Sequence, residues 1–268
     1  AQEITKKAKS NLAFALVCLP KQRRQDMVTF YAFCRVIDDI ADDENISAET
    51  RHQQLDHWRQ LLGNEVPDAA TAFEEQVLQL VQRYQLDVSL LLQIIEGCRS
   101  DIGSPPRFAT WDELQQYTYK VACCVGLIST KIFGCQHPDS ESYAIHLGHA
   151  LQLTNILRDV GHDLKHGARI YLPLDDFEQF DYSIEDLENC TYDSRFVALM
   201  ELQAQRALKL FEEAERSLPD SDRKALRPAE SMKRIYFDIL QQMRQDNFQV
   251  FTKTYKLSKW KKLYHLIR

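Results

Sequence analysis

Apolar residues recur at intervals of three and four positions along almost the whole chain, which is the spacing of one face of an α-helix. The 268 residues include only 8 glycines and 8 prolines, too few for the many tight turns of an all-β fold. Hydrophobic residues make up 44% of the sequence, which is enough for one large core. The pattern therefore predicts an all-α protein whose residues 1–268 form a single domain.

The expected helices are separated by short breaks that contain glycine or proline. They cover residues 3–18, 21–43, 48–63, 68–84, 87–102, 111–134, 140–166, 193–217 and 221–250, with a longer irregular stretch over 167–181. Thr110 is expected to cap the helix that follows it, because a threonine with a glutamate three residues later, Glu113, forms a capping box. No break is long enough to be a linker between domains. The sequence thus predicts one bundle of helices around a central cavity.

The formal net charge of −6 argues against a nucleic-acid partner, since such proteins need a basic surface. The seven cysteines form no CxxC pair, which predicts reduced thiols and a cytoplasmic protein. No apolar run reaches the roughly 18 residues of a membrane span. Residues 253–268, however, combine basic and aromatic side chains without an acid, as a helix lying peripherally on a membrane does. A solvated terminal helix explains the same residues equally well.

Two pairs of aspartates stand on otherwise apolar helices. Asp38 and Asp42 form the first pair, and Asp159 and Asp163 form the second. A spacing of four residues places both carboxylates of a pair on one face of a helix, where like charges repel each other. A cation would offset this repulsion, and carboxylate oxygens are ligands that Mg²⁺ prefers.

An arginine lies close to each pair, Arg35 before the first and Arg158 before the second. Two such pairs facing each other across a cavity would bind a diphosphate, because bridging Mg²⁺ ions neutralise it and arginines add charge-assisted hydrogen bonds. A single acidic cluster is more often a solvated end of a helix. The matching spacing of the two clusters favours the diphosphate site over that alternative.

Several segments resemble the squalene/phytoene synthase family, above all its bacterial presqualene-diphosphate and squalene synthases. The resemblance runs from residue 10 to about residue 263. It is carried by residues 19–35 with the first aspartate pair, 117–126, 152–163, 167–173, 227–229, 235–236 and 250–263. The most specific of these signatures is a helix with the pattern NxxRDxxxD that is followed by the string RIYLP.

The resemblance implies an isoprenoid-synthase helical bundle with a central apolar cavity for two prenyl tails. The implied reaction joins two farnesyl diphosphates head to head to give presqualene diphosphate, with Mg²⁺ as cofactor. NADPH would be needed if the product is then reduced to squalene. Two alternatives stay open: a phytoene synthase that acts on two geranylgeranyl diphosphates, and a catalytically silent member of the family that acts as an assembly factor.

The same likeness assigns roles to single residues. Mg²⁺ would be bound by Asp38, Asp42, Asp159 and Asp163, and the prenyl diphosphate substrates by Arg35, Arg158, Gln152, Asn155, Tyr236 and Lys253. Tyr117 matches a tyrosine that transfers a proton or stabilises a carbocation, and a phenol can do both. Without the resemblance, a core tyrosine with a satisfied hydroxyl group would be the simpler explanation of Tyr117.

Two positions depart from the family pattern. His162 stands where a glutamate is common, which removes a carboxylate from the second acidic cluster. Together with His166 it has the spacing of a transition-metal site, but the family pattern explains the cluster without such a metal. Cys123 stands where glycine is frequent, so its larger side chain is expected to narrow the cavity or to shift the bend of its helix.

Restoring the carboxylate with His162→Glu is expected to lower the Mg²⁺ concentration at half-maximal activity, because it returns an oxygen ligand beside the second pair. The measurement is a Mg²⁺ titration of turnover for both proteins, with His162→Gln as the uncharged control. An unchanged half-saturating concentration would mean that position 162 does not face the metal.

Overall fold

The computed structural model describes residues 16–63, 70–103, 105–258, 261 and 265. Within these residues the regular secondary structure is helical throughout, as the sequence predicts. The elements are η1 (Leu16–Cys18), α3 (Lys21–Asp42), α4 (Ala48–Leu62), α5 (Ala72–Tyr84), α6 (Val88–Arg99), α7 (Trp111–Thr118), η2 (Tyr119–Cys123), α8 (Cys124–Phe133), α9 (Asp139–Lys165), α10 (Leu174–Gln179), α11 (Ile184–Glu188), α12 (Ser194–Ser217), η3 (Asp220–Asp222) and α13 (Arg227–Gln245).

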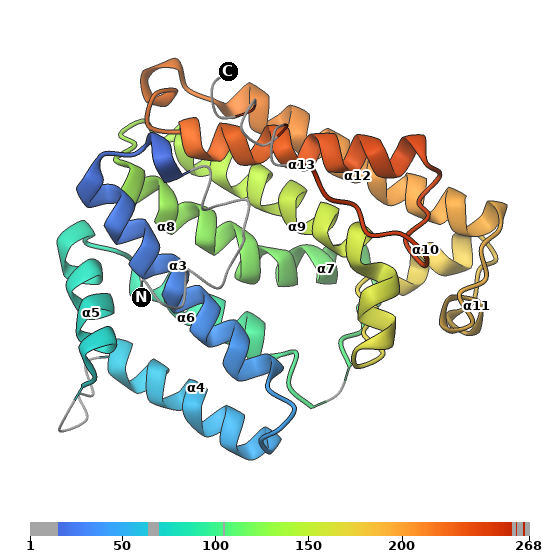
Figure 1. Cartoon of the computed structure of the whole chain (residues 1–268), viewed down its shortest axis with the longest axis horizontal. Helices are drawn as coiled ribbons and strands as arrows, with labels where there is room; N and C mark the ends of the chain where they lie inside the picture. Colours follow the sequence, from blue (N-terminus) through green and yellow to red (C-terminus); the bar gives the residue numbers. More distant parts are fainter. Residues whose placement is uncertain (1–15, 64–69, 104, 259–260, 262–264, 266–268) are drawn as a thin grey trace.

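Helix α9 forms the centre of the bundle. Its 27 residues pack against α12, α8, α13 and the η2 segment, so that residues on several of its faces are buried. Figure 1 shows α12 and α13 along one edge of the molecule, α9 and α8 in the middle, and α3, α4, α5 and α6 toward the opposite edge. A helix with apolar residues on most sides is stable only when neighbours cover it. The length of α9 therefore sets the length of the bundle.

The predicted helix over residues 111–134 is interrupted by one π-helical segment, η2. Glycines of two neighbouring helices make room for it: a Cβ atom on Gly97 would lie 2.6 Å from Cγ1 of Val121, and one on Gly148 would lie 2.8 Å from Cα of Cys123. The wide turn places Val121 and Ala122 on the wall of a cavity. Such π-helical insertions are rare in proteins as a whole, but many of those that occur lie at functional sites.

Cys123 lies in this π-helical segment and is fully buried. Its thiol donates a hydrogen bond to the carbonyl oxygen of Ile145 on α9, at 3.2 Å. The side chain thus faces α9, while the cavity wall at this level is formed by Val121 and Ala122. Cys123 is not part of the lining of the cavity, and both effects expected of its side chain, on the cavity and on the bend of the helix, stay predictions.

The predicted boundaries differ from the structure where proline or a left-handed backbone intervenes. The last predicted helix, 221–250, is shorter and begins at Arg227, because Pro228 lacks an N–H group and is favoured in a first helical turn. It ends at Gln245, since Asn247 and Phe248 have φ angles of 48° and 57°. Residues 174–179 form α10 inside the stretch expected to be irregular.

The N-cap predicted at Thr110 is confirmed, because its hydroxyl oxygen accepts a hydrogen bond from the backbone N–H of Glu113 at 3.3 Å. The carboxylate of Glu113 accepts from the N–H of Ala109 instead of Thr110, at 2.6 Å. The predicted helix over 3–18 lies outside the described residues except for η1, and the basic segment 253–268 is described only in part. Within the described ranges, no helix combines the length and the apolar character that a bilayer span requires.

Replacing Gly148 with alanine is expected to lower the free energy of unfolding by about 1–3 kcal/mol, because the new methyl group would overlap the backbone of Cys123. Urea denaturation measures this loss. Gly63→Ala is the control, since a Cβ there would come no closer than 3.3 Å to any atom. Equal stability of the two variants would show that α9 and the π-helical segment are not in tight contact.

Candidate functional site

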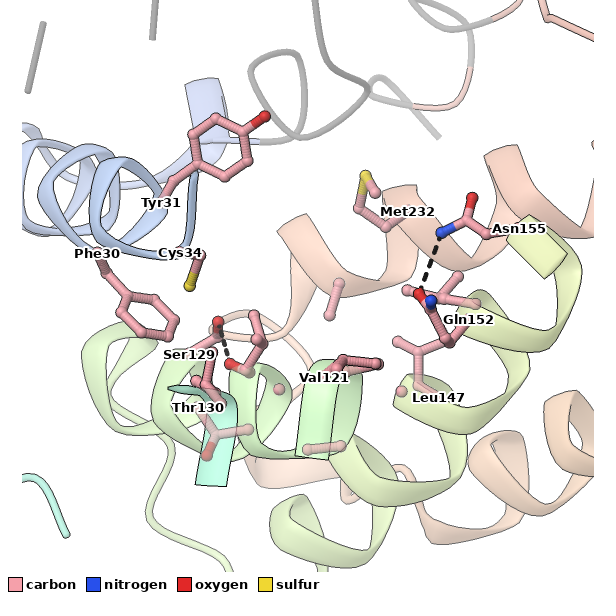
Figure 2. Close-up of a pocket in the computed structure, with 18 of the residues that line it drawn as sticks. Phe30, Tyr31, Cys34, Val121, Ser129, Thr130, Leu147, Gln152, Asn155 and Met232 are labelled. Carbon is pink, nitrogen blue, oxygen red and sulfur yellow. Dashed lines mark hydrogen bonds between the residues drawn. The ribbon is translucent and has the colours of Figure 1, made fainter. Parts of the chain in front are cut away.

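A cavity of about 470 Å³ lies inside the bundle, between α3, α6, α8, α9, α13 and the π-helical segment. Most of its lining is apolar. Figure 2 shows Phe30, Tyr31 and Cys34 of α3 on one side of the cavity and Leu147, Gln152 and Asn155 of α9 with Met232 of α13 on the other. This is the central apolar cavity that the sequence analysis expects.

The cavity is polar at one end and apolar at the other. Three of the helices that line it, α3, α9 and α13, run in the same direction (Figure 1). Phe30 precedes Asp38 on α3, and Tyr143 precedes Asn155 on α9. The twelve residues from Tyr143 to Asn155 span about 18 Å of helix. An amphiphile with an anionic head and a long apolar tail would match this polarity.

Arg35 neutralises part of the first aspartate pair. Its guanidinium group lies 2.7 Å from the carboxylate of Asp38 and 2.7 Å from that of Asp39. Burial, and next the negative charge of Asp42, raise the pKa of Asp38 to about 6 although Arg35 acts in the opposite direction. The first pair therefore carries more negative charge than its own arginine offsets.

The second pair has the same character. Asp159 accepts a hydrogen bond from Nε of Arg158 at 2.8 Å. Burial, followed by the charge of Asp159, raises the pKa of Asp163 to about 6. Nδ1 of His162 lies 3.4 Å from the carboxylate of Asp163, but this imidazole is 68% exposed and its ring stacks on that of His166 at 4.2 Å.

Arg169 joins the two acidic clusters. Its guanidinium group forms an ion pair with Asp42 at 2.8 Å, and its positive charge lowers the pKa values of Asp38 and Asp163 against the effect of burial. The ends of α3 and α9 are thus brought together through a residue of the loop after α9. From the sequence Arg169 was expected only as part of the family signature, because its contact with Asp42 joins residues 127 positions apart and no local pattern signals it.

Tyr117 lies among aromatic rings at the polar end of the cavity. It is 8% exposed, and its ring centroid lies 5.2 Å from that of Phe108 and 5.5 Å from that of Tyr171. Its hydroxyl group donates a hydrogen bond to Oδ2 of Asp101 at 2.8 Å. Burial is the main cause that raises the pKa of Tyr117 well above 10, so the phenol keeps its proton.

Sequence analysis did not identify Asp101 as a site residue. Asp101 lines the cavity just after the end of α6, where an acidic side chain meets the negative end of the helix dipole. That unfavourable position was the available signal. Burial raises its pKa to about 7, and its Oδ1 atom is buried without a hydrogen-bond partner.

The predicted site residues fall into two groups in the structure. The cavity is lined by Arg35, Asp38, Tyr117, Gln152, Asn155 and Tyr236, whereas Asp42, Arg158, Asp159, Asp163 and Lys253 lie outside its lining. Four residues of the second group belong to the acidic clusters at its polar end. Lys253 differs, because its amino group pairs with Asp246 and lies 5.0 Å from the ring centroid of Tyr255.

The oxygen donors at the polar end suit a hard cation that shares its ligands with a substrate. Oδ1 of Asn155 is buried and has no hydrogen-bond partner, as is Oδ1 of Asp101. Among the described residues, no three histidine, cysteine, aspartate or glutamate side chains are grouped so as to hold a metal ion by themselves. Mg²⁺ is commonly bound by one or two carboxylates, waters and substrate phosphates. The aspartate pairs and Asn155 fit that mode of binding.

A profile described as squalene/phytoene synthase matches residues 5–261. The chain therefore belongs to the squalene/phytoene synthase family, and it is a head-to-head prenyl transferase of that family. The resemblance seen in the sequence is thereby confirmed.

Among curated relatives, the 15-cis-phytoene synthase of Synechococcus elongatus is 34% identical over 98% of this chain and 88% of its own length. The corresponding enzyme of Synechocystis is 34% identical over 99% of this chain and 82% of its own. Phytoene synthase 1 of Zea mays, a chloroplastic protein, is 32% identical over 97% of this chain and 65% of its own.

Two solved structures have the same fold. A dehydrosqualene synthase in complex with a ligand has a TM-score of 0.82 and 29% identity, and the match covers 99% of this chain and 92% of that one. Squalene synthase HpnC of Alicyclobacillus acidocaldarius has a TM-score of 0.80 and 26% identity, with 92% of each chain covered. The predicted isoprenoid-synthase helical bundle is therefore confirmed.

Asp38→Asn is expected to abolish product formation and to leave the metal-free protein as stable as the wild type or more stable at pH 8. A raised pKa means that the folded protein disfavours the ionised form of Asp38. The ionised carboxylate therefore lowers the free energy of unfolding above about pH 6, and this effect is lost as the pH falls below that value. Melting temperature and turnover at saturating Mg²⁺ are measured together. Asp139→Asn, an exposed change at the distant start of α9, is the control. Wild-type turnover of Asp38→Asn would refute a role of this carboxylate in catalysis.

Proposed function

We propose that this protein condenses two geranylgeranyl diphosphates to phytoene. The observation that carries this choice is the 34% identity to cyanobacterial phytoene synthases over nearly the full chain. The solved structures of a dehydrosqualene synthase and a squalene synthase are 29% and 26% identical to it. This favours the alternative from the sequence analysis over the condensation of two farnesyl diphosphates. NADPH would be needed only by a reaction that proceeds to squalene.

The two ends of the cavity bind the two chemically different ends of each substrate. The diphosphate lies at the polar end, where Arg35, Arg158 and Arg169 offer charge-assisted hydrogen bonds. The prenyl tail lies along α8 and α9 toward Phe133 and Tyr143, which line the far part of the cavity. Apolar burial of the tails supplies binding energy and also fixes the allylic carbons near the polar end.

The aspartate pairs would hold the cofactor. Asp38 and Asn155 line the cavity, and Arg169, which pairs with Asp42, also acts on the charge of Asp163. Both pairs, on α3 and α9, would therefore meet at this end of the cavity. Bound there, Mg²⁺ would neutralise the charge that develops on the departing diphosphate. The raised pKa values of Asp38 and Asp163 support this assignment, since a cation relieves the repulsion that causes part of each shift.

The apolar wall protects the reaction from water. Loss of diphosphate leaves an allylic carbocation, which water would quench. Tyr117 lines the cavity, the rings of Phe108 and Tyr171 pack against it, and an aromatic face stabilises positive charge. The double bond of the second substrate can then attack the cation before solvent does.

The aspartate pairs and Tyr117 argue against a catalytically silent assembly factor, and His162 is the one feature that favours it. A peripheral position at a membrane stays a prediction from the amphiphilic substrates and from the basic segment 253–268. The described part of that segment includes Tyr255 and Leu257, which are buried in the bundle.

The decisive test is the hydrocarbon that the purified protein makes from each substrate. With Mg²⁺ and geranylgeranyl diphosphate, phytoene is the expected product, and NADPH should leave its amount unchanged. Gas chromatography with mass spectrometry identifies the products, and a chelated sample is the control. A hydrocarbon formed only from farnesyl diphosphate would overturn the choice of substrate, and no product from either would overturn the function.

A further inference from the structure

Asp101 is a half-buried residue with one fully buried carboxylate oxygen, and its role in the reaction is unassigned. One oxygen, Oδ2, accepts the hydrogen bond from Tyr117, and the other, Oδ1, is buried without a partner. Both residues line the cavity near Asp38. A buried carboxylate oxygen without a hydrogen bond costs stability, so its retention needs a reason other than folding.

The hydrogen bond fixes which way the hydroxyl group of Tyr117 points. A phenol has one hydrogen, and here it is directed at Asp101. The oxygen of Tyr117 therefore has only lone pairs left for the interior of the cavity. In this state Tyr117 can accept a proton from a carbocation, but it cannot donate one to a departing diphosphate.

We propose that Asp101 is the positioning residue of Tyr117, which it holds as a proton acceptor and whose proton it takes. The inference rests on the head-to-head condensation proposed above. It gives a direction to the proton transfer that the family resemblance implies for Tyr117: the phenol removes a proton from the carbocation and does not donate one to the leaving group.

The proton step breaks one bond for each bond that it forms. A C–H bond of the carbocation breaks, its electron pair closes the cyclopropane ring, and its proton goes to the oxygen of Tyr117. The original phenolic proton moves along the hydrogen bond to Oδ2 of Asp101, which becomes a neutral carboxyl group. After the product leaves, the proton returns through Tyr117 to water at the polar end of the cavity.

The surroundings of Asp101 suit this step. Burial raises its pKa to about 7, although the hydrogen bond from Tyr117 and the charge of Arg169 act in the opposite direction. A carboxylate with such a pKa holds a proton better than a solvated one, and it is close to the optimum for an acid–base group at neutral pH. A carboxylate that only stabilises the fold would not need a raised pKa.

The chain contains a matched pair with a structural role. Tyr84 donates a hydrogen bond to Oδ2 of Asp26 at 2.7 Å, and Asp26 is buried. Asp26 also pairs with Arg83 at 2.5 Å, and neither Asp26 nor Tyr84 lines the cavity. Asp26 is thus neutralised by an arginine outside the cavity, whereas Asp101 is part of the lining of the cavity.

The first test compares Asp101→Asn with Asp26→Asn. Asparagine keeps the shape of the side chain but cannot take up a proton at neutral pH. Asp101→Asn should lower kcat about 10²-fold or more with KM within about two-fold of the wild type. It should also raise the ratio of diphosphate released to hydrocarbon formed, because ionisation continues while proton loss fails. Asp26→Asn should change the melting temperature and leave both kcat and that ratio unchanged.

The second test is a double-mutant cycle with Tyr117→Phe, measured on protein whose folding is checked by circular dichroism. If Asp101 acts through Tyr117, then adding Asp101→Asn to Tyr117→Phe lowers kcat no further. Multiplied losses in the double variant would overturn the proposal, as would diphosphate release that falls in step with hydrocarbon formation. Both outcomes are distinct from a failure of the proposed function, in which the wild-type protein itself makes no head-to-head product.

Discussion

The arrangement of this protein depends on holding several carboxylates together at one end of an apolar cavity. Like charges that are partly buried repel each other and are poorly solvated, and the pKa values of Asp38 and Asp163 rise for both reasons. Arg35, Arg158 and Arg169 offset part of this charge. The remaining negative charge of the carboxylates is not neutralised by any of these arginines. A site that is incomplete in this way will bind a cation together with an anionic substrate more readily than either alone.

The bundle supports this site because α9 is long, central and covered on several sides. Its first half contributes Tyr143 and Leu147 to the apolar part of the cavity, and its second half contributes Gln152 and Asn155 to the polar end. One rigid element therefore sets the distance between the polar and the apolar end of the cavity. If the diphosphate binds at the polar end as proposed, this distance limits the length of the tail that the cavity holds.

The π-helical segment links the cavity wall to the reactive end. It follows directly on Tyr117 and Thr118, and it fits against α6 and α9 only because Gly97 and Gly148 lack side chains. The hydroxyl group of Thr118 contacts Nδ1 of His149 at 2.8 Å, and burial lowers the pKa of this histidine to about 4. A neutral His149 can stay buried beside Thr118 without a counter-ion. The local packing thus holds the backbone of Tyr117 while Asp101 orients its hydroxyl group.

By itself the sequence determined the helical class, most helix positions and the two aspartate pairs. Helical periodicity and i, i+4 spacing depend only on residues that are close together in the chain. It could not separate α7 and α8, since the π-helical turn depends on glycines of other helices, nor place the start of α13 within a few residues. The tertiary structure alone decided that Asp101 meets Tyr117 and that Arg169 bridges to Asp42, because these partners are 16 and 127 positions apart in the chain. Lys253 was assigned to a diphosphate from its place in the sequence. In the structure it pairs with Asp246, because the chain turns back after α13. Contacts between distant residues arise only when the core forms, so no local pattern could contain them.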